Sequence, residues 1–101
     1  MKIYCNRRDG SLASQLYKFI GKDVWFKVYE KDINLLAYHL IEEIEDDIVY
    51  FKELHVDLYG HYTKSSCSAT LEEYERYYSI VDPIQVYTTS ELSERLGEDI
   101  G

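Results

Sequence analysis

Hydrophobic and polar residues alternate with a period of two between positions 24 and 30. Successive side chains of a β-strand point to opposite faces, so this alternation predicts a half-buried strand. Its β-branched and aromatic residues support the same assignment. The two faces of this strand carry Val24, Phe26 and Val28 on one side and Trp25, Lys27 and Tyr29 on the other.

Residues 33–45 fit two periodicities and leave two assignments open. A helix capped by Asp32 would place these apolar residues on one face: Ile33, Leu36, Ala37, Leu40, Ile41 and Ile44. Against a helix, the acidic run at 45–47 is typical of a tight turn, and regular alternation follows it. Because strands that are adjacent in sequence commonly pair, we favour a meander of strands near 24–30, 36–44 and 48–58.

The N-terminal part of the chain predicts a strand followed by a helix. Residues 2–5 alternate in character, as a strand requires. Ser11 is a preferred N-cap residue, and Gly21 supplies the left-handed conformation that commonly ends a helix. Between them, one helical face carries the apolar side chains Leu12, Leu16, Phe19 and Ile20.

Two later helices are predicted from capping boxes, in which a Thr and a Glu three residues later satisfy each other's backbone donors. Thr70 and Glu73 have this spacing and predict a helix over residues 71–78. Thr88 and Glu91 repeat the spacing and predict a second helix. Both predicted helices are short.

The remaining segments predict a loop, a break and a short strand. Residues 60–69 are mostly small and polar, which is typical of an exposed loop. Asp82 before Pro83 predicts a break, and residues 84–87 a short strand behind it. Gly97 is placed to end the last helix.

Together these elements predict an α+β fold in a single domain, residues 1–101, with a small antiparallel sheet and about three short helices. The pattern also allows the sheet to curl into an SH3-like barrel. A chain of 101 residues buries roughly 65% of the surface of its unfolded form, which suffices for a core without metal or disulfides.

The location expected from the sequence is cytoplasmic. The longest stretch without a charged residue, residues 33–41, is far shorter than the ~20 residues that cross a bilayer. The N-terminal residues lack the apolar run of a signal peptide. We therefore expect no membrane association and two free thiols.

Charge is unevenly distributed along the chain, whose net charge is -8. Residues 1–31 contain seven basic and three acidic residues, a net charge of +4. Residues 32–101 contain sixteen acidic and four basic residues, a net charge of -12. Such an imbalance attracts oppositely charged partners and also allows head-to-tail self-association. The acids form three clusters: Glu42, Glu43, Glu45, Asp46 and Asp47; Glu72, Glu73 and Glu75; and Glu91, Glu94, Glu98 and Asp99.

Candidate chemistry is sparse in this sequence. It contains none of the motifs GxGxxG, HExxH, GxSxG or CxxC, so we predict no enzymatic activity and no cofactor. The best set of metal-ligating residues is His55, Asp57 and His61, because alternate strand residues share a face and Gly60 permits a turn. Structural zinc needs four ligands, so we favour ordinary surface histidines and predict no metal site.

Three other side chains, those of His39, Cys67 and Cys5, carry groups that can react. His39 has no acidic partner at a spacing that would orient it, so a surface position is expected. Cys67 lies near Lys64, whose charge would lower the pKa of a neighbouring thiol. Since no general base is placed beside it, we expect an exposed thiol without a catalytic role. Cys5 lies in an apolar strand and is expected in the core.

The leading functional hypothesis is a non-enzymatic protein that binds a basic protein surface. Carboxylates at strand and helix spacings imitate the phosphates of a nucleic acid, and eleven tyrosines suit a contact surface. The composition resembles in general character small acidic inhibitors of phages and mobile elements, including anti-CRISPR and anti-restriction DNA mimics. The residues expected to contact the partner are Glu42, Glu43, Glu45, Asp46, Asp47, Glu72, Glu73, Glu75, Tyr74, Tyr77 and Tyr78.

The alternative hypothesis is a small nucleic-acid-binding module that uses the basic N-terminal part. Aromatic rings on a sheet stack on bases while nearby cations neutralise phosphates. The candidate residues are Arg7, Arg8, Trp25, Lys27 and Tyr29. Direct nucleic-acid binding is not expected, because the net charge of residues 32–101 repels the same polymer. In that case Trp25 packs against the N-terminal helix or the ends of the chain.

Overall fold

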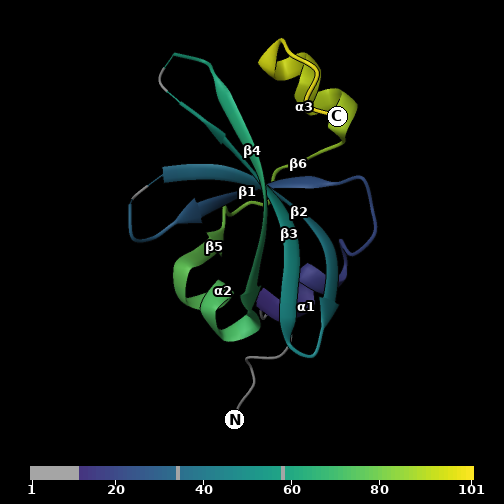
Figure 1. Cartoon of the computed structure of the whole chain (residues 1–101), viewed down its shortest axis with the longest axis vertical. Coiled ribbons are helices and arrows are strands. Elements are labelled where there is room, and N and C mark those ends of the chain that lie inside the picture. Colours follow the sequence, from purple (N-terminus) through teal and green to yellow (C-terminus); the bar gives the residue numbers. More distant parts are fainter. Residues whose placement is uncertain (1–11, 34, 58) are drawn as a thin grey trace.

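The structure, a computed structural model, describes residues 12–33, 35–57 and 59–101. Figure 1 shows one sheet accompanied by three helices, which confirms the predicted α+β class. The strands are β1 (Trp25–Glu30), β2 (Leu35–Glu45), β3 (Ile48–Val56), β4 (Tyr62–Thr70), β5 (Tyr78–Ile80) and β6 (Val86–Tyr87). The helices are α1 (Leu12–Tyr17), α2 (Leu71–Tyr77) and α3 (Thr89–Leu96).

The sheet is antiparallel, with the strand order β4-β3-β2-β1-β5 and with β6 paired to the start of β1. Strands β1, β2 and β3 form the predicted meander. Residues 35–45 are a strand rather than a helix, because pairing with β1 and β3 satisfies their backbone groups on both sides. Among the described residues β4 and β5 do not pair with each other, so the sheet stays open and an SH3-like barrel is not formed.

The predicted turn between β2 and β3 is confirmed. Asp46 and Asp47 form a two-residue connection, and both have positive φ, 52° and 62° respectively. These values fit a type I′ turn, whose twist matches that of the strands it joins. Aspartate tolerates this left-handed conformation better than most residues, so the acidic pair suits the turn as well as the surface.

β2 contains a bulge that determines which residues oppose one another further along the hairpin. The register with β3 shifts between Ile41 and Glu43, so that Glu42 is the extra residue. Beyond the bulge His39 lies opposite Glu53. The bulge therefore brings an imidazole and a carboxylate together on the same face of the sheet.

β4 corrects the prediction of an exposed loop over residues 60–69. It is a strand of nine residues that pairs with β3 along its whole length. The small polar residues resemble a loop in composition because most of them face solvent on an edge strand. Cys67 and Ala69 are half-buried and pack against the core, which ties the edge strand to the rest of the sheet.

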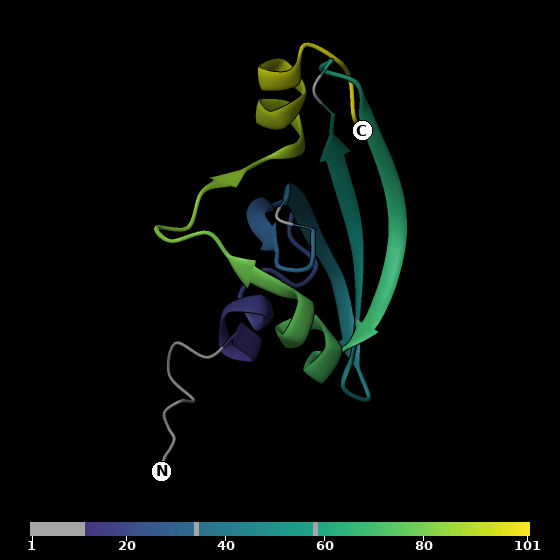
Figure 2. The ribbon, with the colours of Figure 1, turned by 90° about the vertical axis from the view of Figure 1, so that its left-hand side faces the viewer.

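Alternating side chains of the sheet supply two hydrophobic clusters on its opposite faces. The first cluster packs beneath α1 and α2 and contains Leu16, Phe26, Val28, Ala37, Ile41, Val49, Phe51 and Tyr74. The second cluster packs with α3 and contains Trp25, Leu54, Leu92 and Ile100. Figure 2 shows α1, α2 and the β2–β3 hairpin toward one end of the molecule, and α3 with the C-terminus toward the other.

Both predicted capping boxes are present. The N–H of Glu73 donates to the Thr70 hydroxyl at 3.0 Å, and the N–H of Thr70 donates to the Glu73 carboxylate at 2.9 Å. Thr88 and Glu91 form the same reciprocal pair at the start of α3. α3 ends at Gly97, whose φ of 76° is the left-handed conformation expected of a C-terminal glycine.

Two shorter elements also follow the prediction. α1 confirms a helix in the N-terminal part, although it ends at Tyr17 before the predicted Gly21. β6 confirms a short strand behind the Asp82–Pro83 break. The strand predicted at 2–5, with Cys5, and the Ser11 cap lie outside the described residues. In the described ranges, no helix has the length and apolar character needed to cross a membrane.

Candidate functional site

Two of the three acidic clusters lie together at one end of the molecule. One occupies the β2–β3 hairpin and the other occupies α2, which lies beside that hairpin in Figures 1 and 2. The N–H of Leu71 donates to the carbonyl oxygen of Asp47 at 2.8 Å and joins the helix start directly to the turn. We call this surface the acidic end; it comprises Glu42, Glu43, Glu45, Asp46, Asp47, Glu72, Glu73 and Glu75.

All eight residues of the acidic end are exposed. Three cations lie near it. The Lys52 ammonium is 3.9 Å from the Glu42 carboxylate, and Arg76 lies in the last turn of α2. The Lys31 ammonium donates to the backbone carbonyl of Glu75 at 3.0 Å. Eight carboxylates against three cations leave this end with an excess of negative charge in the described part of the chain.

The three tyrosines expected to accompany these acids differ in exposure. Tyr77 is exposed, and the Arg76 guanidinium lies 6.0 Å from the centre of its ring. Tyr78 is half-buried, and Tyr74 is fully buried in the first hydrophobic cluster. The prediction that Tyr74 contacts a partner is wrong, because α2 packs this ring against the sheet.

Trp25 does not offer a stacking surface for bases. It is 2% exposed and packs with Leu92 and Ile100 in the second hydrophobic cluster. Its indole N–H donates to the Thr89 hydroxyl at 3.0 Å. This corrects its place in the predicted nucleic-acid face and confirms the expectation that it packs against an end of the chain.

The other residues of the predicted nucleic-acid face are half-buried or lie outside the described residues. Lys27 and Tyr29 are half-buried, and the Lys27 ammonium lies 5.8 Å from the centre of the Tyr38 ring. Arg7 and Arg8 lie outside the described residues. Because the Trp25 ring is buried, the predicted nucleic-acid face lacks its largest aromatic ring. The described residues therefore do not support the alternative hypothesis of a nucleic-acid-binding module.

The predicted ligand set of His55, Asp57 and His61 does not converge. His61 is 82% exposed, and its Nδ1 is 3.9 Å from the nearer carboxylate oxygen of Asp57. Asp57 instead accepts hydrogen bonds from the N–H groups of Tyr59 and His61, which shapes the connection between β3 and β4. His55 contacts a different carboxylate, that of Glu53.

A buried polar chain that the sequence did not predict runs from α2 through β2 to β3. The Tyr74 hydroxyl is 2.6 Å from Nδ1 of His39, and Nε2 of His39 is 2.9 Å from Glu53. Burial lowers the pKa of His39 and raises the pKa of Tyr74 well above its usual value. Tyr74 therefore donates to neutral His39, which donates to Glu53. The expected surface position of His39 is wrong.

Glu53 accepts hydrogen bonds from three side chains. Its two oxygens lie 2.9 Å from Nε2 of His39 and 2.8 Å from Nε2 of His55, and Tyr78 is the third partner. Burial would raise the pKa of Glu53, but its hydrogen bonds and other interactions with His39 and His55 outweigh the effect of burial and lower the pKa to about 2. Burial, followed by the charge of Glu53, raises the pKa of Tyr78, which keeps its hydroxyl protonated.

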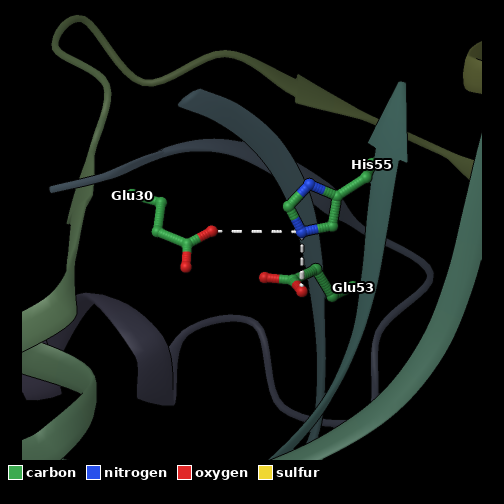
Figure 3. Close-up of side chains that lie close together, drawn as sticks. All are labelled: Glu30, Glu53 and His55. Carbon is green, nitrogen blue, oxygen red and sulfur yellow. Dashed lines mark ion pairs between the residues drawn. The ribbon is translucent and has the colours of Figure 1, made fainter. Parts of the chain in front are cut away.

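Glu30 on β1 completes a cluster with Glu53 and His55 on β3. Figure 3 shows the three side chains pointing toward one another across the sheet, with Oε2 of Glu30 3.9 Å from Nε2 of His55. One ligand atom from each residue lies within 4.8 Å of the other two. Burial, followed by the charge of Glu53, raises the pKa of Glu30.

Cys67 does not have the environment expected of a reactive thiol. Burial, assisted by the charges of Glu53 and Glu30, raises the pKa of its thiol. The expected effect of Lys64 is absent because residues three apart on a strand point to opposite faces. The thiol is therefore protonated at neutral pH.

Comparisons with protein-family models, curated proteins and solved structures find no match for this chain. Its function is therefore inferred from its own residues. The acidic end can attract a cationic surface, and the cluster of two carboxylates and an imidazole can bind a cation.

Proposed function

We propose that this protein is a non-enzymatic interaction protein that binds a basic protein surface through the acidic end. The supporting observation is the hydrogen bond between Leu71 and Asp47, which places two exposed acidic clusters beside each other. Fields from neighbouring charges add, so this surface attracts a cationic partner more strongly than either cluster alone. Contact with a basic partner also relieves the repulsion among the carboxylates.

The narrower form of the proposal is that the partner binds nucleic acid and that the acidic end occupies its basic groove. Alternate strand residues stand ~6.6 Å apart, and helical neighbours stand ~5 to 6 Å apart. Phosphates of one strand rise ~3.4 Å per nucleotide along the axis, so carboxylates at these intervals would meet the cations that contact about every second phosphate. The protein would then act as the DNA-mimicking inhibitors of phages and mobile elements do.

Tyr77 adds an uncharged contact to this surface. It is 37% exposed and lies on α2, two residues after Glu75. Tyrosine supplies contact area at a low entropic cost and is enriched at interfaces. We therefore place Tyr77 beside the carboxylates in the proposed interface, while Tyr74 and Tyr78 support the helix from within.

A matched pair of double variants tests the proposal. Glu43→Gln with Glu72→Gln removes one charge from each acidic cluster, and neither residue belongs to the β2–β3 turn or to the capping pair of Thr70 and Glu73. Glu94→Gln with Glu98→Gln makes the same change in charge near α3, at the other end of the molecule. Each protein is immobilised, incubated with cell lysate at low salt and eluted with increasing salt.

The wild type and the Glu94/Glu98 variant should retain the same salt-released partner. The Glu43/Glu72 variant should retain at least about tenfold less, because it loses attraction at the proposed interface. The proposal fails if the wild type retains no partner that salt releases, or if the two double variants bind equally.

Competition with double-stranded DNA tests the narrower form. DNA added at constant ionic strength should release a partner whose nucleic-acid groove is occupied by the acidic end. A partner that is released by salt but not by DNA would contradict the DNA-mimic form and leave the basic-surface proposal in place.

A further inference from the structure

We propose that Glu30, Glu53 and His55 bind a divalent transition-metal ion of the Zn²⁺ type. The three side chains come from β1 and β3 and converge on one point, as Figure 3 shows. His55 Nε2 is 2.8 Å from Glu53 and 3.9 Å from Glu30, and all three ligand atoms lie within 4.8 Å of one another. Ligands of tetrahedral zinc are about 3.4 Å apart, so small side-chain rotations suffice.

The charge of this cluster favours a cation. Glu30 and Glu53 are two carboxylates held close together and largely removed from solvent, with side chains 21% and 10% exposed. The ion pairs formed by these two carboxylates within the described residues involve only histidines. Two neighbouring negative charges repel each other, and a divalent ion between them would remove that repulsion.

The surrounding residues hold one ligand in position, as the outer partners of metal ligands commonly do. His39 donates to one oxygen of Glu53, and Tyr74 in turn holds His39. The other Glu53 oxygen faces His55. Carboxylates that bind metals are typically fixed by such outer hydrogen bonds, which leave the remaining oxygen free for the ion. Tyr78 supports the same carboxylate from β5.

The site is partly open. The side chain of His55 is 34% exposed, so an ion can enter from solvent and water can complete its coordination. Three protein ligands and an open position are typical of zinc sites that hold water or a small ligand in the fourth position, rather than of closed structural sites. Imidazole favours zinc, copper, iron and nickel over magnesium and calcium, which selects a transition metal.

Metal binding replaces an existing hydrogen bond. In the structure the Nε2 position of His55 is hydrogen-bonded to Oε1 of Glu53. The ion would bind the deprotonated Nε2 and the Glu53 oxygen, the Nε2 proton would pass to solvent, and the neutral imidazole would carry its single proton on Nδ1. Glu30 would then approach as the third ligand, and its charge would be neutralised together with that of Glu53.

Calorimetric titration with Zn²⁺ tests the proposal on the full chain without a histidine tag. The wild type should bind one ion per chain. Glu30→Gln and His55→Gln should each weaken binding by at least about tenfold, since each removes a direct ligand. His61→Ala is the matched control. It removes an exposed histidine from the connection between β3 and β4, outside the proposed site, and should leave the affinity for Zn²⁺ unchanged. The Glu43/Glu72 double variant controls for binding at the acidic end and should also leave it unchanged.

A second measurement needs no substitution in the cluster. On addition of Zn²⁺ to the wild type, the Nε2 resonance of His55 in imidazole ¹⁵N spectra should shift, and that of His61 should not. The proposal is overturned if no ion binds, if His61→Ala weakens binding as much as His55→Gln does, or if Zn²⁺ leaves the His55 resonance unchanged. These outcomes do not depend on the interaction proposed for the acidic end.

Discussion

At the scale of single residues, His39 is a polar side chain buried against the rings of the first hydrophobic cluster. It is fully buried between the Tyr74 hydroxyl and the Glu53 carboxylate. His39→Phe keeps an aromatic ring but leaves the Tyr74 hydroxyl without its partner and removes one of the three hydrogen bonds to Glu53. We expect this variant to lower the free energy of unfolding by about 2 to 4 kcal/mol, measured by urea denaturation.

A double-mutant cycle separates the lost hydrogen bond from altered packing. Tyr74→Phe removes the hydroxyl that His39→Phe leaves unsatisfied. The double variant should therefore be less destabilised than the sum of the single variants by about 1 kcal/mol or more. Two outcomes would contradict the buried hydrogen-bond chain. One is that the effects of the two single variants add up to that of the double variant; the other is that His39→Phe lowers the free energy of unfolding by less than about 0.5 kcal/mol.

The position of His39 was not predictable from the spacing of residues along the chain. The pairing of Glu45 with Ile48, continued regularly from the two-residue turn, would place His39 opposite Leu54. The bulge at Glu42 shifts the register by one residue and brings Glu53 opposite instead. A bulge has no strong local sequence signal, so the acidic partner of the histidine was missed, and with it the cluster of Glu53 and His55.

At the scale of elements, capping residues were predictable because they act within a few positions of one another. Both capping boxes are present as the Thr and Glu spacing indicated. β4 was missed because its stability comes from pairing with β3 rather than from its own composition. The acidic clusters were recognised separately, but their meeting at one end depends on β4, which carries the chain back to the hairpin.

The capping box of α2 predicts a local pH dependence. The backbone N–H of Thr70 donates to Glu73 and lowers the pKa of that carboxyl below its ordinary value of 4.5. Because the pKa is lower in the folded state, this contribution to stability is complete above about pH 4.5 and is lost as pH falls through the folded pKa. A ¹³C NMR titration of Glu73 should give a midpoint below 4.5.

Two variants test the cause of that shift. Thr70→Ala removes the side chain that holds the reciprocal pair and should move the Glu73 midpoint toward its ordinary value. Thr88→Ala removes the equivalent cap of α3 and should leave Glu73 unchanged. Because alanine keeps the backbone N–H that donates to Glu73, an unchanged midpoint in Thr70→Ala would show that this N–H, without the Thr70 hydroxyl, is enough to lower the pKa of Glu73.

At the scale of the whole molecule, the net charge of -8 and the acidic end predict a stability that depends on salt. Repulsion among exposed carboxylates opposes folding, and salt screens it over a distance of ~10 Å at 0.1 M. Raising sodium chloride from about 20 mM to about 0.5 M should therefore increase the free energy of unfolding by on the order of 1 kcal/mol. Urea denaturation at each salt concentration measures this increase.

The location of the repulsion distinguishes the acidic end from a uniformly negative surface. The Glu43/Glu72 and Glu94/Glu98 double variants have the same net charge and respond alike to the general effects of salt on hydrophobic burial. If the repulsion is concentrated where the hairpin meets α2, the Glu43/Glu72 variant should gain less stability from added salt than the Glu94/Glu98 variant. Equal salt responses in the two variants would mean that repulsion among carboxylates is no stronger at the acidic end than near α3. The acidic end would then have no stronger field than the rest of the surface, and no greater attraction for a basic partner.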